Sequence, residues 1–334
     1  MRFLRHALIV IAALFPTQIA LTPYALAQDA ATTTVQAAAP LATGPVTVQV
    51  GAYILRITDV VQKDGTFTVD MWTWFRWKDG DVKPYGTFEI SNGRIESRSE
   101  VSVQRDGDMN YASLRIGATV FHDYDVKKYP MDDHFLTISI EDEAAAIDQI
   151  VYATDDNTAM DPGVNVPGWA VKLAAPSVSD HVYPTNYGLL SNTAASTYSQ
   201  LNFNVELHRE GFGPLFKQFW IAGLSVLLGL LAFKVKATDL DARFGLGVGS
   251  IFAASANAFV ISDSLPQSTV ITMAEQINFL AIGTIFLCVA MSIFSLRLCY
   301  LGRDDQSEQL DSRAMAVIGI GYVVVNVAIV ALSL

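Results

Sequence analysis

Cysteine is scarce in this chain of 334 residues, which contains only Cys288 and Cys299. Both lie in, or at the end of, one apolar stretch near the C-terminus, so no disulfide can connect the segments that precede it. The N-terminal part must therefore fold without disulfides. The five histidines show no spacing typical of metal ligands, and we find neither a glycine-rich phosphate loop nor a nucleophile motif. These absences leave an enzyme, a metal centre or a cofactor with little support.

Basic residues are also in deficit. The chain has 22 lysines and arginines against 33 acidic residues, for a formal net charge of -11. Nucleic acids select basic surfaces, so this balance argues against a nucleic-acid partner. An acidic protein is better suited to cations.

The N-terminus has the organisation of a secretory signal peptide. Arg2 and Arg5 precede a mainly apolar run from Ala7 to Ala20, and Ala25-Leu26-Ala27 forms a small-x-small cleavage site. We therefore expect residues 1–27 to be a signal peptide. An uncleaved anchor helix is the alternative, although a proline and two polar residues interrupt the apolar run.

The segment 44–210 has the pattern of an all-β domain, and it follows an Ala/Thr-rich lead at 28–43 that we expect to be disordered. Short β-branched and aromatic runs alternate with turn residues, which is typical of a sandwich or barrel. The clearest pair is Val46–Val61 and Thr66–Trp77, joined by a hairpin signal at Lys63-Asp64-Gly65. We predict an extracellular, immunoglobulin-like sandwich of about ten strands. The further runs are Thr87–Ile90, Ser99–Gln104, Tyr111–Phe121, Phe135–Ile140, Ile150–Ala153, Trp169–Ala174 and Ser199–Arg209.

The second strand has aromatic residues on both faces. Alternation places Trp72, Trp74 and Arg76 on one face, and Thr73, Phe75 and Trp77 on the other. Only one face can form the sandwich core, so the face with Trp72 needs a cover from a ligand or another subunit. A long loop of the same chain is the alternative cover.

The remaining residues, 211–334, contain four apolar stretches, each about the ~20 residues that a membrane-spanning helix needs. We therefore predict a four-helix transmembrane domain. The stretches are Phe219–Val235, Phe244–Ile261, Ile277–Leu296 and Ala314–Leu334.

Positive residues between the stretches predict the orientation, because cytoplasmic loops accumulate lysine and arginine. The second break, Ser262–Gln276, has no positive residue, whereas the first and third each have three. The N-terminal domain and the C-terminus are therefore expected outside the cytoplasm. The positive residues are Lys234, Lys236, Arg243, Arg297, Arg303 and Arg313.

Four passages together resemble the pentameric ligand-gated ion channels, the superfamily of the Cys-loop receptors and their prokaryotic relatives. The resemblance implies a homopentamer in a bacterial inner membrane, with a periplasmic ligand-binding domain and a pore for monovalent cations. The passages are Val50-Gly51-Ala52-Tyr53 leading to Phe67-Thr68-Val69-Asp70 and Trp77-Lys78-Asp79; Tyr129-Pro130-Met131-Asp132; Arg209; and Leu265-Pro266.

The resemblance implies a gating interface between the two domains. Tyr129, Pro130 and Asp132 resemble the tip of the Cys-loop without its cysteines, and the pattern implies that Asp132 pairs with Arg209. Further contributors would be Asp64 of the hairpin and the Leu265-Pro266 pair after the second membrane helix.

The second apolar stretch aligns with the family's pore helix. Acidic residues at both ends would form rings that favour cations, and two phenylalanines would form a hydrophobic constriction. The alternative is that Gly245-x-x-x-Gly249 packs against another helix of a non-conducting anchor. At helical spacing the pore-facing residues would be Asp241, Gly245, Gly249, Phe252, Ala256, Phe259 and Asp263.

Ligands of this family bind between neighbouring extracellular domains. One side would supply Trp72, Trp74 and Arg76, while the hairpin between Val178 and Tyr198 resembles the loop that caps the ligand. Aromatic faces attract ammonium groups, so a small amine is one candidate agonist. Protons acting on acidic residues or histidines are the other. The capping side would supply Tyr183, Tyr187 and Tyr198, with Tyr152 as a further contributor.

A periplasmic binding or sensor protein, whose helices only anchor it or relay a signal, is the alternative function. The third break is too short for a cytoplasmic enzymatic domain. Such a relay would need a separate partner.

Overall fold

The computed structural model describes residues 44–78, 82–188, 196–267 and 270–333. The predicted signal peptide and the predicted disordered lead lie outside the described residues.

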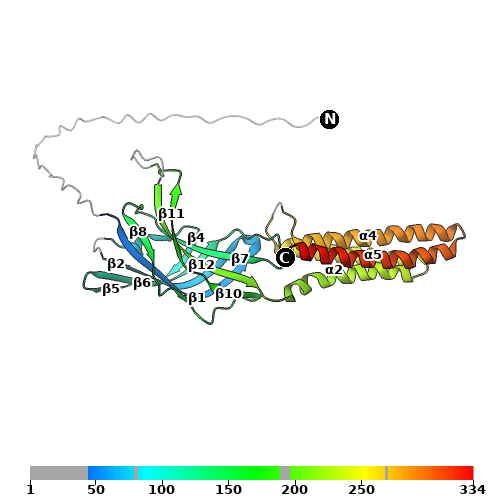
Figure 1. The fold of residues 1–334 in the computed structure, drawn as a ribbon, viewed down its shortest axis with the longest axis horizontal. Coiled ribbons are helices and arrows are strands. Elements are labelled where there is room, and N and C mark those ends of the chain that lie inside the picture. Colours follow the sequence, from blue (N-terminus) through cyan, green and yellow to red (C-terminus); the bar gives the residue numbers. More distant parts are fainter. Residues whose placement is uncertain (1–43, 79–81, 189–195, 268–269, 334) are drawn as a thin grey trace, which may run out of the picture. The chain divides into compact units, whose positions relative to one another are not determined.

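Residues 44–210 form a sandwich of two β-sheets, as predicted (Figure 1). The seven-stranded sheet has the order β4-β6-β2-β1-β8, with β5 on β6 and β9 on β1. The five-stranded sheet has the order β10-β12-β7-β3, with β11 on β12. The strands are β1 (Val46–Val61), β2 (Thr66–Trp77), β3 (Phe88–Ile90), β4 (Gly93–Arg98), β5 (Ser102–Asp106), β6 (Met109–Phe121), β7 (Asp133–Asp142), β8 (Ile150–Thr154), β9 (Ala159–Met160), β10 (Trp169–Leu173), β11 (Ser177–Tyr183) and β12 (Ser196–Arg209).

The hydrophobic core lies between the sheets and follows the period of two that strands impose. On β2, Phe67, Val69 and Phe75 are buried, and Leu136 of β7 and Phe203 of β12 belong to the same buried cluster. Burying each such side chain contributes about 1.5–3 kcal/mol relative to leaving it exposed. These contacts hold the sandwich together without disulfides.

The β1–β2 hairpin was predicted with the correct strand bounds, but its loop differs from a two-residue turn. Gln62–Asp64 form a short 3-10 turn, η1, and Gly65 follows with φ 64°. Val61 pairs with Thr66 across this four-residue loop. A left-handed conformation at this position suits glycine, which has no Cβ to clash.

Four helices follow, as predicted, and they run side by side (Figure 1). They are α2 (Gly213–Leu231), which continues into the 3-10 turn η2 (Ala232–Lys234), α3 (Leu240–Ser264), α4 (Met273–Tyr300) and α5 (Asp304–Ser333). Three of them, α3, α4 and α5, are long and apolar enough to cross a membrane, and a shorter apolar helical stretch covers Phe219–Lys234.

The helices extend beyond the apolar stretches. The predicted break from Arg297 to Arg313 is mostly helical, because α4 continues to Tyr300 and α5 already begins at Asp304. Asp304 and Asp305 lie in the first turn of α5, where their charge complements the helix dipole. Hydropathy detects the apolar part of a helix but misses such polar ends.

Candidate functional site

The predicted Asp132–Arg209 ion pair is present where the sandwich meets the helices. Arg209 Nε donates to Asp132 Oδ1 over 3.1 Å, and the arginine lies 3.8 Å from the centre of the Trp169 ring. Strand β10 pairs with β12 so that Trp169 and Arg209 are direct neighbours. The pair therefore lies in a largely dry environment, since Asp132 is only 1% exposed. Its role in gating stays a prediction.

Two further residues, Gln62 and His134, complete this cluster, and neither was predicted at the interface. Gln62 and His134 each hydrogen-bond Asp132 Oδ2, and Gln62 also accepts a bond of 3.2 Å from Arg209. His134 lies two residues after Asp132, a spacing that places both side chains on the same side of extended backbone. That spacing is a signal that could have identified His134, whereas no signal in the sequence singles out Gln62.

The charge state of Asp132 follows from these contacts. Burial alone would raise the pKa of Asp132, but the hydrogen bond from His134 and the positive charge of Arg209 outweigh it and hold the pKa below its ordinary value. Asp132 is therefore a carboxylate at neutral pH.

The turn with Pro130 contacts the start of α4. The Tyr129–Pro130 peptide bond is cis, and Pro130 is buried. The amide of Met273 donates to the carbonyl of Lys127 over 2.9 Å, and that of Ala274 donates to the carbonyl of Tyr129 over 3.2 Å. The turn thus joins the sandwich directly to α4, the helix that follows α3.

The other predicted interface residues differ in their surroundings. Leu265 is 5% exposed and belongs to the same buried cluster as the sandwich core. Pro266 is half-buried, and Asp64 is exposed. The hairpin residue that contacts the end of α3 is Lys63, whose Nζ lies 2.6 Å from Asp263 Oδ1.

Helix α3 has one buried face and one exposed face within the chain. All seven residues of the predicted pore stripe, from Asp241 to Asp263, are exposed, and Phe252 and Phe259 are 72% and 74% exposed. The opposite face is buried against the rest of the chain. It consists of Arg243, Gly247, Ser250, Ala254, Asn257 and Ile261.

The glycines of α3 bear on the alternative of helix packing. A Cβ at Gly245 or Gly249 would meet no atom within 4 Å, whereas a Cβ at Gly247 would lie 2.7 Å from Val289 Cγ2 on α4. The close approach between helices of this chain therefore occurs at Gly247. Within the part of the chain that the structure describes, Gly245 and Gly249 pack against no other helix.

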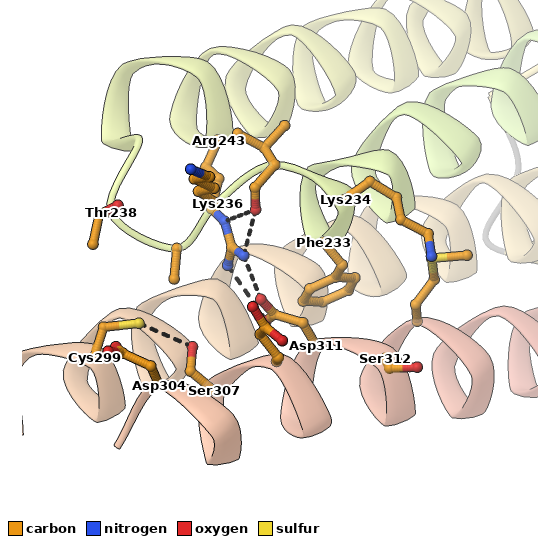
Figure 2. A pocket seen from close by; sticks show the side chains of 14 residues that line it. Phe233, Lys234, Lys236, Thr238, Arg243, Cys299, Asp304, Ser307, Asp311 and Ser312 are labelled. Atoms are coloured by element: carbon orange, nitrogen blue, oxygen red, sulfur yellow. Dashed lines mark hydrogen bonds and ion pairs between the residues drawn. The ribbon is translucent and has the colours of Figure 1, made fainter. Parts of the chain in front are cut away.

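A buried ion pair holds the N-terminal end of α3 in place (Figure 2). Arg243 pairs with Asp311 of α5 and donates from Nε to the carbonyl of Val235 over 2.9 Å. Arg243 was predicted in a polar break, but it lies in the helix and is 4% exposed. These bonds hold this turn of α3 against α5, which leaves Asp241 on the exposed face.

The three tyrosines of the predicted capping side lie together. The ring of Tyr183 on β11 lies 5.6 Å from that of Tyr187 and 5.7 Å from that of Tyr198 on β12. The β11–β12 hairpin brings them together, because its register pairs His181 with Tyr198. Its tip, residues 189–195, lies outside the described residues.

A buried carboxylate lies behind this aromatic group. Glu141 is 1% exposed, and it accepts hydrogen bonds from Tyr183 and Gln200 and pairs with His181 Nδ1 over 2.6 Å. Burial raises the pKa of Tyr183, and the bond to Glu141 raises it further. Burial also raises the pKa of nearby Glu89, as do the charges of neighbouring acids. The site therefore has a negative electrostatic character.

Tyr152 does not belong to this group. It is 2% exposed and lies in the sandwich core, because its position on β8 directs it inward. Tyr152 therefore offers almost no surface to a ligand in this structure, and its part in a ligand site stays a prediction.

The complementary face on β2 has the predicted alternation, and the chain covers part of it. Trp74 Nε1 donates to Asp155 Oδ2 over 3.0 Å, and Arg76 forms an ion pair of 2.8 Å with the same carboxylate. Trp74 also lies against Gly51, where a Cβ would be 2.4 Å from the indole ring. Trp72 is still 40% exposed. A segment of the same chain, the alternative cover, therefore accounts for part of this face but not for Trp72.

The tyrosine group and Trp72 lie on different sheets. Tyr183 and Tyr198 belong to the five-stranded sheet, whereas Trp72 belongs to the seven-stranded sheet. Among the described residues, no hydrogen bond or ring contact joins the two groups.

The chain is similar to an ion channel and to receptor subunits among known proteins. No protein-family model matches the chain. It is 24% identical to a proton-gated ion channel of Gloeobacter violaceus, over 72% of this chain and 70% of that protein. It is 21% identical to the mouse gamma-aminobutyric acid receptor subunit theta, over 75% of this chain, and 23% identical to the human subunit rho-1, over 56%. These matches span only 42% and 38% of the two receptor subunits. The relatives are channels and not enzymes, and the chain is homologous to the pentameric ligand-gated ion channels, the superfamily of the Cys-loop receptors.

Proposed function

We propose that five copies of this chain form a cation-selective channel in a bacterial inner membrane, with the β-sandwich in the periplasm, and that a small amine opens it. The observation that carries this proposal is the division of α3 into a buried face and an exposed face. A stripe that contains aspartates at both ends is unsuited to lipid, since charges in the membrane face a bundle interior or water. Five such stripes around an axis would line a pore.

The chemistry of the stripe supports a gate and a preference for cations. Phe252 and Phe259 project from the helix and would form rings that close the pore by dewetting. Asp241 at one end would form a ring of carboxylates, which attract cations and repel anions. Monovalent cations are the expected permeant ions.

The tyrosine group supports an amine as the agonist. Each aromatic face attracts an ammonium group by about 0.5–2 kcal/mol, depending on desolvation. The carboxylate of Glu141 adds negative charge behind the rings. Trp72 of a neighbouring copy would supply the opposite wall, which explains why a large aromatic side chain is exposed on β2.

Protons are the second candidate stimulus, and a relative that is proton-gated favours testing them. The His181–Glu141 pair lies behind the tyrosine group, and the His134–Asp132 pair lies where the sandwich meets the helices. Protonation of either imidazole would add a positive charge beside a carboxylate. Current recordings during pH steps, followed by a panel of amines at constant pH, distinguish the two stimuli.

Cysteine accessibility tests the pore. We expect a water-soluble thiol reagent to modify F252C and A256C and to block the current, because both positions lie on the exposed stripe. A254C is the matched control, since Ala254 lies on the buried face of the same helix. The native cysteines are first replaced by serine. Protection of both stripe positions in every condition would contradict the pore and favour the non-conducting anchor.

Ion preference tests the acidic ring separately. The variant D241K should shift the reversal potential under a salt gradient towards that of anions. An unchanged reversal potential would remove Asp241 from the selectivity mechanism.

A further inference from the structure

An ion pair joins the β1–β2 loop to the end of the pore-facing stripe. Lys63 Nζ lies 2.6 Å from Asp263 Oδ1, and the two side chains are 48% and 66% exposed. Lys63 belongs to η1, whereas Asp263 lies in the last turn of α3. The two residues line one groove of about 490 Å³ together with Asp64 and Phe259.

The pair matters through charge rather than through stability. Exposed ion pairs contribute little to folding stability, because water screens their charges. The electrostatic potential at a pore mouth depends instead on the net charge of the groups that line it. A lysine within 2.6 Å offsets the charge of Asp263 even when the pair adds little stability.

Three charged side chains set the net charge of the groove. Lys63 contributes one positive charge, while Asp64 and Asp263 each contribute one negative charge. Each chain therefore has one net negative charge there, and without Lys63 it would have two. Five copies of Asp263 around the axis would therefore attract cations less strongly than five unpaired carboxylates.

We infer that Lys63 is a selectivity-determining residue, which offsets the charge of Asp263 at the outer end of the pore and so weakens the attraction of cations there relative to the Asp241 end. This inference rests on the proposed channel function. It assigns a permeation role to a residue of the β-sandwich, whereas the sequence predicted an acidic ring at each end of the pore.

Single-channel recording tests the inference, because unitary conductance is separate from the probability of opening. The variants are K63Q, D263N and the double variant K63Q/D263N. The matched control is K172Q, which removes a lysine of an exposed ion pair with Glu206 on the sandwich.

The expected pattern has opposite signs. In about 0.1 M salt, K63Q should raise the inward cation conductance by about twofold, and D263N should lower it by a similar factor. The double variant should return to the wild-type value, since its net charge is the same. In about 1 M salt, where the Debye length falls to about 3 Å, the differences should largely disappear. K172Q should match the wild type throughout.

Two other results are distinguishable. If the wild type conducts but K63Q and K172Q both match it, Lys63 has no role in permeation and the inference is overturned while the channel function stands. If the wild-type protein carries no current under pH steps or amines, the proposed function and this inference both fail.

Discussion

Replacing Asp132 by asparagine tests whether the junction cluster stabilises the protein. Asparagine has nearly the same shape, so the substitution removes the charge without opening a cavity. It leaves Arg209 beside Trp169 without its carboxylate, and it weakens the bonds from Gln62 and His134.

The structure sets the size of the effect. Removing one partner of a buried ion pair costs about 3–5 kcal/mol. The Arg209 side chain is 17% exposed, so water recovers part of this loss. We therefore expect D132N to reduce the free energy of unfolding by about 2–4 kcal/mol. For a domain of this size, 1 kcal/mol shifts Tm by about 2–4 °C, so Tm should fall by roughly 5–15 °C.

Thermal unfolding of the full-length protein in detergent, followed by tryptophan fluorescence, measures this shift. D108N is the matched control, because it makes the same substitution in the exposed Lys78–Asp108 pair, whose atoms are 3.7 Å apart. The control should shift Tm by no more than about 2 °C. If D132N and D108N unfold at the same temperature, the cluster does not contribute to stability as argued.

Two further predictions concern packing and pH. G247A should lower Tm, because its Cβ would lie 2.7 Å from Val289 and overpacking costs about 1–3 kcal/mol. G245A should leave Tm unchanged or raise it, because a Cβ there would meet no atom within 4 Å. A lower Tm for G245A would instead favour the helix-packing alternative. Thermal unfolding between about pH 3 and 7 should show two losses of stability on acidification. Burial lowers the pKa of His122 below its ordinary 6.5, so the unfolded chain binds the proton at a higher pH than the folded chain does. The free energy of unfolding should therefore decrease as the pH falls below about 6.5, and H122F should abolish this decrease. The lowered pKa of Asp132 gives a second loss as the pH falls below its ordinary 3.8, and D132N should reduce it.

The sequence predicted best the strands and helices that bury one face, because burial gives them a regular pattern of apolar residues. Strands β1 and β2 and the four helices were identified because alternating or continuous apolar residues accompany a buried face. The three strands that were missed lack this pattern. For example, β4 has the sequence Gly-Arg-Ile-Glu-Ser-Arg and is largely exposed, and β9 has only two residues. Pairing with a neighbouring strand, and not local composition, defines such edge strands.

Site residues divide in the same way. The Asp132–Arg209 pair, the tyrosine group and the stripe of α3 could be predicted because a motif or a period places them. Glu141 appeared in the sequence only as one of three consecutive charges, and its contacts depend on β11 pairing with β12, which in turn pairs with β7. The burial of Tyr152 could not be predicted from the sequence, because short strands carry no signal of which face is inward.

The contacts between the sandwich and the helices differ in strength, and this difference bears on how a movement would pass between them. The Tyr129 turn is joined to α4 by two backbone hydrogen bonds, and the side chains of Thr272 and Glu275 cap the same helix end reciprocally. The charged link from the hairpin to α3 is the exposed Lys63–Asp263 pair, which costs little to break. A displacement of the sandwich is therefore expected to move the start of α4 directly, while the end of α3 can change its contact with Lys63 at small cost. Because that contact also sets the charge beside Asp263, the same movement would change both the width and the electrostatic potential of that end of the proposed pore.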